Sequence, residues 1–171
     1  MNVDNRFRGR YRASSARMAG WDYRWAGVYG VAIRVLRCPL GLSDIVDGRV
    51  TLSSIGEIVG QEWERIPGRH PHVWLDRWVV MPDHLHGILI FEQGMAEGPV
   101  PKSRLLADSL GAVLGQFKSK TTKRIRATGL DFHWQPRYYD QILANAAALE
   151  KMRSYIERNP RNWNPDEPNN F

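Results

Sequence analysis

The sequence has little of three features that would set it apart from an ordinary intracellular domain: cysteine, long apolar runs and internal repeats. A single cysteine, Cys38, leaves no partner for an internal disulfide, which fits a reducing compartment. No apolar run reaches the ~18 residues that a membrane helix needs. The basic start MNVDNRFRGRYR also lacks the apolar block of a signal peptide. We therefore expect a cytoplasmic protein that makes no contact with a membrane.

The two ends of the chain differ in composition from its middle. Residues 1–20 are polar and basic without periodicity, and residues 164–171 are a polar tail in a segment rich in Asn and Pro. Such segments are typically extended or mobile. The chain of 171 residues is 43% hydrophobic and 25% charged, which is enough to bury one core. We expect a single folded domain preceded by a flexible basic segment.

Basic residues exceed acidic ones and are concentrated in one stretch. The formal net charge is +6. The stretch GQFKSKTTKRIRATG has no acidic residue and contains the basic cluster, which comprises Lys118, Lys120, Lys123, Arg124 and Arg126. This density is expected of a surface that binds the phosphate groups of a nucleic acid. A solvated helix face explains the pattern equally well, so the charge alone leaves the partner open.

Several segments have the pattern of β-strands. The apolar run at 27–37 predicts the first strand, and residues 42–52 predict a hairpin that turns at Asp47-Gly48. Two more strands are expected at 72–81 and 86–92, separated by PDHL. The aromatic segment DFHWQPRYYDQIL is expected to contain a short fourth strand.

Three segments have helical periodicity, namely residues 53–66, 110–125 and 145–158. Ser54 and Glu57 have the spacing of a capping box in the first, which should end before Pro67. The second is amphipathic and has the basic cluster on its outer face, and Pro160 ends the third.

The order of these elements predicts the fold class. Strand, helix, strand, strand, helix and strand describe an α+β protein with a ferredoxin-like, split βαβ antiparallel sheet. The third helix is then an addition at the C-terminus. The Gly/Pro-rich segment 92–103 is expected to be a flexible loop.

Two histidines, His84 and His86, lie in an otherwise apolar strand. Side chains two residues apart leave the same face of a strand, so both imidazoles converge while Leu85 enters the core. In the last helix Tyr155 and Asn159 are four residues apart, about one turn along one face. If this helix lies across the sheet, the phenol and the amide can reach the histidines. Two imidazoles, a carbonyl oxygen and open positions suit a catalytic divalent cation better than a structural zinc ion.

Each of these residues also has a simpler interpretation. A His-x-His pair is often partly buried in a strand with its hydrogen bonds satisfied, and a helical tyrosine is more often a packing residue. With a pKa of ~10, a tyrosine attacks poorly unless a cation or a base assists it. Spacing alone leaves both interpretations open.

Several motifs together resemble one family. WVVMPDHLHGILIF, WQPRYYDQILAN and MRSYIERNP are similar to motifs of the REP-associated tyrosine transposases, relatives of the single-tyrosine insertion-sequence transposases of the HUH nuclease superfamily. GWDYRWAGVYGVAI also resembles the opening and first strand of many members. The resemblance covers residues 21–163, where we expect a HUH single-tyrosine transposase domain.

The resemblance implies a role for each candidate site residue. His84 and His86 match the two histidines of the HUH motif, and Asn159 matches a further polar metal ligand. Tyr155 matches the catalytic tyrosine, so the C-terminal helix carries it. The implied enzyme uses Mg²⁺ or Mn²⁺ and cleaves and rejoins single-stranded DNA next to hairpin or palindromic repeats. The implied intermediate is a 5′-phosphotyrosine.

The implied partner is single-stranded or hairpin DNA. The basic cluster is then a set of backbone contacts, and Arg137 in the aromatic segment could contact unpaired bases. The implied protein is nucleoid-associated and works as a monomer or a homodimer.

Four positions depart from the family pattern. Many relatives have His at the position of Gln141 and Glu at the position of Ala146, and Gly30 and Arg34 interrupt a usually smoother apolar first strand. Two other functions use the same residues. One is a domesticated, non-catalytic protein that binds palindromic DNA, and the other is a metal-dependent hydrolase with water as the nucleophile.

Overall fold

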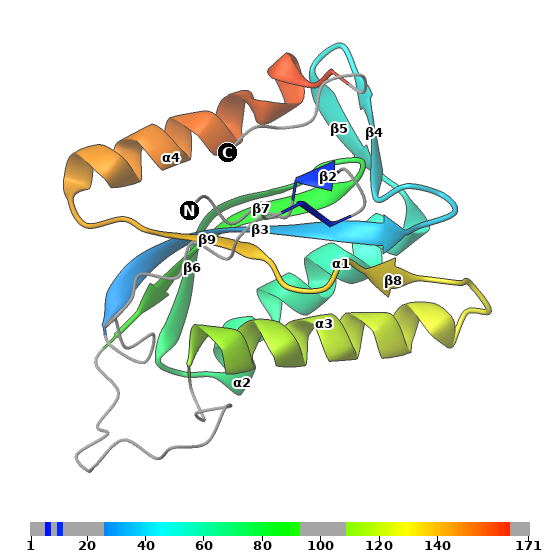
Figure 1. Cartoon of the computed structure of the whole chain (residues 1–171), viewed down its shortest axis with the longest axis horizontal. Helices are drawn as coiled ribbons and strands as arrows, with labels where there is room; N and C mark the ends of the chain where they lie inside the picture. The colour runs from blue at the N-terminus through cyan, green and yellow to red at the C-terminus, as the bar shows by residue number, and fades with distance from the viewer. Residues whose placement is uncertain (1–5, 8–9, 12–25, 93–108, 165–171) are drawn as a thin grey trace.

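A long central strand, β3 (Gly27–Arg37), organises the sheet. The computed structural model describes residues 6–7, 10–11, 26–92 and 109–164. On one side β3 pairs antiparallel with β7 (His84–Phe91), and β6 (Val73–Val80) pairs with β7. On its other side β3 pairs with the short strands β8 (His133–Trp134) and β9 (Tyr139–Ile142). This is the strand order of a ferredoxin-like fold, as predicted (Figure 1).

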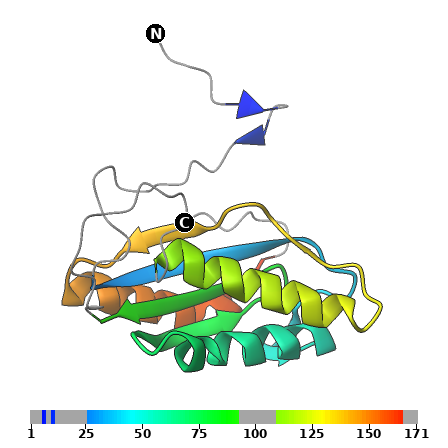
Figure 2. The same cartoon turned by 90° about the horizontal axis from the view of Figure 1, so that it is seen from below.

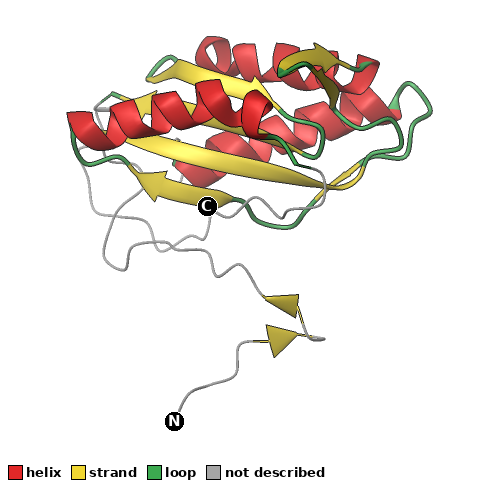
Figure 3. Ribbon diagram, turned by 90° about the horizontal axis from the view of Figure 1, so that it is seen from above, coloured by secondary structure: helices red, strands yellow, loops and turns green. Residues whose placement is uncertain are grey.

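Helices cover both faces of this sheet. Helix α1 (Ser54–Glu64), followed by the short α2 (Ile66–Arg69), and helix α3 (Leu110–Arg126) lie on one face (Figure 2). Helix α4 (Ala146–Arg158) lies on the other face and continues into a 3₁₀ turn, η1 (Asn159–Asn162). Figure 3 shows α4 over the strands, on the opposite side from α1 and α3.

The pleat of the strands divides the core into two layers. Ile33 and Leu85 are fully buried in the larger cluster, with side chains of α1 and α3. Ile88 packs instead with Leu143 and Ile156 in a smaller cluster beneath α4. Because side chains alternate along a strand, the even-numbered positions of β7 face α4.

A glycine lets the histidine-bearing strand approach α1 closely. A Cβ atom on Gly87 would lie 2.4 Å from Cζ2 of Trp63. Trp63 is fully buried and contacts Phe117 edge-on, with ring centroids 5.2 Å apart. A side chain at position 87 would therefore push against an indole ring that has no room to move.

The predicted hairpin is present. Strands β4 (Ser43–Val46) and β5 (Arg49–Leu52) pair antiparallel across the turn at Asp47 and Gly48. These two residues have φ angles of 51° and 70°. Positive φ at both central positions matches the twist of the flanking strands, which explains the Asp-Gly signal.

The start of α1 differs from the prediction by one residue. Ser53, not Ser54, is the N-cap, and its side chain accepts a hydrogen bond of 3.1 Å from the Gly56 N–H. The predicted capping box is therefore wrong. The helix ends before Pro67 as expected, and that proline lies in the first turn of α2, where its missing N–H has no cost.

The fourth strand is split in two. β8 pairs with the end of β3 and β9 with its middle, and the backbone between them turns at Arg137, whose φ is 68°. Pro136 in the same segment cannot donate a ladder hydrogen bond, which explains the interruption.

Some predictions fall wholly or mostly outside the described residues: the flexible segment 1–20, the loop 92–103 and the tail 164–171. Within segment 1–20, β1 (Arg6–Phe7) and β2 (Arg10–Tyr11) pair antiparallel. No helix in the described ranges is long and apolar enough to cross a membrane.

Candidate active site

The two histidines of β7 meet beneath α4. His84 is fully buried and His86 is 2% exposed. Their ring centroids are 4.6 Å apart, and the ring planes are at 84° to each other. Leu85 between them enters the opposite layer of the core. The convergence that the strand geometry predicted is therefore present.

Both imidazoles are in environments suited to binding a metal ion. His84 Nδ1 lies 2.5 Å from Asp83 Oδ1, and this bond fixes the orientation of the ring. Burial, the charge of His84 and, to a smaller extent, the charge of Arg34 lower the pKa of His86 to about 2. His86 is therefore neutral near pH 7, and only an unprotonated imidazole nitrogen can act as a ligand.

Tyr155 on α4 completes the group. Its ring centroid lies 5.3 Å from that of His86, with the rings nearly perpendicular. Burial raises the pKa of its hydroxyl, while a hydrogen bond with Asn159 and the charge of Arg34 act in the opposite direction. Asn159, at the start of η1, is 5% exposed. The structure thus brings together all four residues that the sequence selected as nucleophile and ligands.

Two contacts hold α4 in this position, and a glycine makes room for it. Ile156 packs on Ile88 in the smaller core cluster. Arg153 binds the Asp76 carboxylate of β6 through Nε and Nη2, at 3.0 and 2.5 Å from Oδ2. A Cβ atom on Gly30 would lie 2.7 Å from Met152 Cε. The glycine that interrupts the first strand thus makes room for α4, which carries the tyrosine.

The other interruption of that strand, Arg34, lies at the site. In the register of β3 and β7 it is opposite His84. Side chains of directly opposed residues lie on the same face of an antiparallel pair, so Arg34 is on the α4 face. Burial alone would raise the pKa of Asp83, but the hydrogen bond with His84 and the charges of His84 and Arg34 hold it below its usual value.

The candidate donors at this site come from histidine and asparagine side chains. Among the described residues there is no group of three or more His, Cys, Asp or Glu side chains that could hold a metal ion. Here the donors are two imidazoles, from His84 and His86, with the amide of Asn159 nearby. Pairing of a ligand histidine with a carboxylate, as in His84 and Asp83, is typical of metal sites. The residues therefore fit a divalent cation that keeps positions open for oxygen ligands.

The basic cluster is not part of this group, because α3 lies on the opposite face of the sheet from α4 (Figure 1). Lys118 donates from Nζ to the carbonyls of Gln135 and Arg137, at 2.6 and 2.9 Å. Arg126 donates from Nε to the Phe132 carbonyl at 3.1 Å. These two side chains therefore hold the β8 segment against α3.

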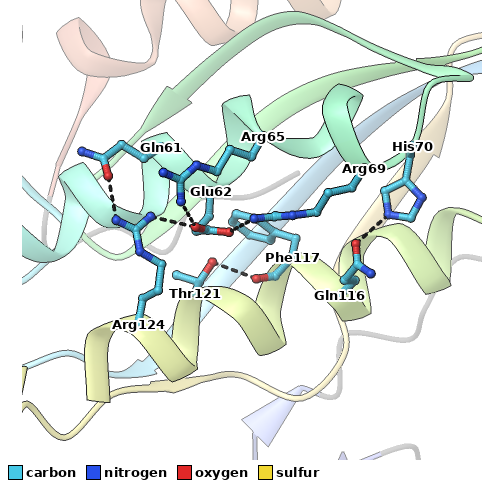
Figure 4. Close-up of polar contacts among 9 residues, drawn as sticks. All are labelled: Gln61, Glu62, Arg65, Arg69, His70, Gln116, Phe117, Thr121 and Arg124. Atoms are coloured by element: carbon cyan, nitrogen blue, oxygen red, sulfur yellow. Dashed lines mark hydrogen bonds and ion pairs between the residues drawn. The ribbon is translucent and has the colours of Figure 1, made fainter. Parts of the chain in front are cut away.

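Arg124 belongs to an ionic cluster between α1 and α3 (Figure 4). Its Nη1 lies 2.7 Å from Oε1 of Glu62, a carboxylate that is 1% exposed. Arg65 and Arg69 bind the same carboxylate at 2.7 and 2.6 Å. Burial would raise the pKa of Glu62, but the hydrogen bonds from Arg69, Arg124 and Arg65 together lower it. Sequence periodicity alone could not identify this pairing.

An open groove of about 590 Å³ lies between α3 and β8. Basic and aromatic groups form much of its lining, which consists of Lys118, Ser119, Thr122, Lys123, Arg126, His133 and Trp134. Lys120 and Lys123 are exposed on α3. Of the predicted DNA contacts, the groove includes Lys118, Lys123 and Arg126.

Three residues at the candidate active site were not among those predicted from the sequence. Asp83 precedes His84 directly, so its position was a signal that a carboxylate could orient the ring. Arg34 was treated only as a departure from an apolar pattern. Trp163, which follows η1, places its ring 6.0 Å from that of His84 between centroids, and no signal in the sequence indicated this contact.

Comparison with known proteins supports the fold. No family model matches the chain. An uncharacterized protein from Haemophilus influenzae (strain ATCC 51907 / DSM 11121 / KW20 / Rd) is 29% identical over 169 residues, covering 93% of this chain and 94% of that protein. The solved structure of a REP-associated tyrosine transposase bound to a REP hairpin matches 84% of this chain and 73% of its own, with a TM-score of 0.59 and 20% identity. The chain therefore has the α+β fold of that transposase.

Proposed function

We propose that this protein is a metal-dependent endonuclease and strand transferase of the HUH single-tyrosine type. Its substrate is single-stranded DNA next to a hairpin or palindromic repeat. The observation that carries the proposal is the position of Tyr155, whose ring lies 5.3 Å from His86 between centroids and whose hydroxyl is hydrogen-bonded to Asn159. Tyr155, His84, His86 and Asn159 lie on one face of the sheet, which supports these roles.

In the proposed reaction the Tyr155 hydroxyl oxygen attacks phosphorus. The bond from phosphorus to the 3′ oxygen breaks, the tyrosine loses its proton, and the 3′ oxygen leaves as a hydroxyl. The product is a 5′-phosphotyrosine linkage, which conserves the phosphodiester energy for rejoining by a 3′-hydroxyl. Mg²⁺ or Mn²⁺, held by His84, His86 and Asn159, would supply the electrophilic activation of the phosphodiester.

The protein residues have separate tasks in this reaction. Asp83 orients the His84 ring through the bond at Nδ1. Burial keeps His86 neutral and available as a ligand. Asn159 donates a hydrogen bond to the Tyr155 oxygen, which lowers the pKa of the hydroxyl, and its amide oxygen would be the ligand.

The proposed DNA partner is favoured by the charge of the chain as well as by the fold. The neighbour with a TM-score of 0.59 is a transposase bound to a REP hairpin. In this chain the groove between α3 and β8 combines cationic side chains with Trp134 and His133, a combination suited to phosphates and unpaired bases.

The test is a search for a covalent protein–DNA adduct on denaturing gels. Labelled single-stranded oligonucleotides from palindromes near the gene are mixed with the protein in Mn²⁺ or in EDTA. We expect an adduct in Mn²⁺ that Tyr155→Phe and His84→Ala abolish. Tyr138→Phe is the matched control, because Tyr138 packs against the core on the opposite face. Cleavage that persists without an adduct in Tyr155→Phe would instead indicate a hydrolase that uses water.

A second candidate is a non-catalytic protein that binds palindromic DNA. The observation that favours it is the location of the basic groove, which lies on the opposite face from Tyr155 and does not need the histidines to bind DNA. Tight palindrome binding with no adduct in any divalent metal would support this candidate over the enzyme.

A further inference from the structure

Arg34 brings a positive charge to the face of the sheet that carries the histidines. It lies opposite His84 in the register of β3 and β7, and Ala32 lies opposite His86. The side chain is half-buried. The small residues Gly30 and Ala32 precede it on the same face, so Arg34 is the first long side chain of β3 next to the pair.

The charge of Arg34 acts on the Asp83 carboxylate without a direct ion pair. None of the described residues forms a hydrogen bond or ion pair with its guanidinium. Other arginines in this part of the molecule are paired: Arg37 with Asp131 at 2.6 Å, and Arg153 with Asp76 at 2.5 Å. A half-buried guanidinium offers five N–H donors, so an anionic ligand is the partner that its chemistry favours.

The charge of Arg34 also reaches the groups that surround the site. It acts on Asp83, on His86 and on the hydroxyl of Tyr155. These groups belong to α4, to β7 and to the residue just before it, and Arg34 shares the α4 face of the sheet with His84 and His86. An anion bound to Arg34 would therefore lie on the face of the sheet that α4 and Tyr155 cover.

We propose that Arg34 is a catalytic residue that binds a non-bridging oxygen of the scissile phosphate. This inference rests on the function proposed above. The reaction itself is unchanged: the bond from Tyr155 to phosphorus forms, the bond from phosphorus to the 3′ oxygen breaks, and the leaving oxygen takes up a proton. Arg34 forms no covalent bond and loses no proton. Its contribution is to neutralise the charge that accumulates on the phosphate oxygens.

A binding experiment without metal tests the contact directly. After the cleaved position is mapped from the adduct, two oligonucleotides are compared in EDTA, one with the natural phosphate and one with an uncharged methylphosphonate at that position. We expect the wild-type protein to bind the phosphate form about tenfold more tightly, the effect of one charge-assisted hydrogen bond. Arg34→Ala should bind both forms alike. Arg37→Ala, which removes a charge from the same strand at an exposed position, should keep the preference.

The rate of adduct formation provides the second readout. Arg34→Ala should slow a single turnover in Mn²⁺ by about 100-fold, as expected for the loss of one group that stabilises the transition state. Arg34→Lys should recover part of the rate, and Arg37→Ala should leave it unchanged. Because the guanidinium forms no hydrogen bond or ion pair with the described residues, the unfolding midpoint of Arg34→Ala should lie close to that of the wild type.

Two results would overturn this assignment while leaving the proposed function intact. One is an Arg34→Ala variant that forms the adduct at the wild-type rate. The other is a variant that retains the preference for phosphate over methylphosphonate. A wild-type protein that forms no adduct in any divalent metal would instead overturn the proposed function, and the assignment of Arg34 with it.

Discussion

Replacement of Glu62 by Gln should destabilise the protein by removing the charge that three arginines share. Glu62 is 1% exposed, and its oxygens lie 2.6 to 2.7 Å from nitrogens of Arg65, Arg69 and Arg124. Gln has nearly the same shape but presents an N–H₂ group where one oxygen accepted a hydrogen bond. The helices α1 and α3 lose the ionic contact that joins them (Figure 4).

The size of this effect follows from the exposure of the three partners. A hydrogen bond to a buried charged group contributes about 1.5–3 kcal/mol. The Arg65 side chain is 54% exposed, however, so its contact is screened like a surface pair and contributes only about 0.2–1 kcal/mol. Arg69 and Arg124, at 28% and 35%, are partly hydrated after the substitution. Together we expect a loss of about 3 kcal/mol, or a Tm lower by about 6–12 °C.

The pH dependence of the stability difference between wild type and Glu62→Gln tests whether the charge of Glu62 causes it. The pKa of Glu62 is lower in the folded protein than its ordinary value. Its stabilising contribution is therefore fully present above the unfolded-state pKa of about 4.3 and is lost as the pH falls through the folded-state pKa. The gap in urea-unfolding free energy between wild type and Glu62→Gln should be full at pH 7 and shrink below about pH 4.3. Glu64→Gln, on the exposed side of α1, is the control. Equal stabilities at pH 7 would refute the reasoning.

Three further predictions concern the histidine strand, the residue before it and the basic cluster. Gly87→Ala should destabilise the protein by about 1–3 kcal/mol in urea unfolding, because the added methyl group overlaps a buried indole ring. Gly115→Ala is the comparison: it lies at an exposed helical site with open space around it and should stabilise the protein by up to ~1 kcal/mol. Asp83→Asn should weaken Mn²⁺ binding about 10–100-fold in calorimetry through the adjoining histidine, and unchanged affinity would contradict the orienting role. Replacing Lys120 and Lys123 by Ala should weaken DNA binding for many sequences alike and flatten its salt dependence; an unaltered salt slope would remove them from the binding surface.

The residues of the candidate active site could be selected from the sequence because their positions depend on short-range geometry. His84 and His86 share a face in any regular strand, and Tyr155 and Asn159 share a face in any regular helix. The strand order followed from the alternation of elements. The N-cap of α1 was missed because Ser53 and Ser54 are adjacent and only the backbone conformation decides between them.

The remaining features depend on contacts between distant segments. Periodicity showed that the basic cluster lies on one helix, but not that this helix covers the face opposite to the histidines. It also gave no sign that Arg124 would bind Glu62, 62 positions away, or that Lys118 would hold the carbonyls of the β8 segment. In the sequence, Gly30 and Arg34 only interrupt an apolar strand pattern. The packing of α4 shows that Gly30 makes room for this helix, and the register with β7 places Arg34 opposite His84.

If the proposed function holds, the placement of the groove and the tyrosine on opposite faces of the sheet has a consequence for the length of the DNA between them. Duplex DNA is stiff over distances far greater than one small domain, so a single stem cannot bend around the sheet to reach both places. If both are occupied, the stem stops at one and an unpaired linker passes the edge of the sheet to the other. Such an arrangement sets a minimum length for the linker. With fewer unpaired nucleotides the phosphate cannot reach Tyr155, whereas a longer linker costs only the small additional entropy of closing a larger loop.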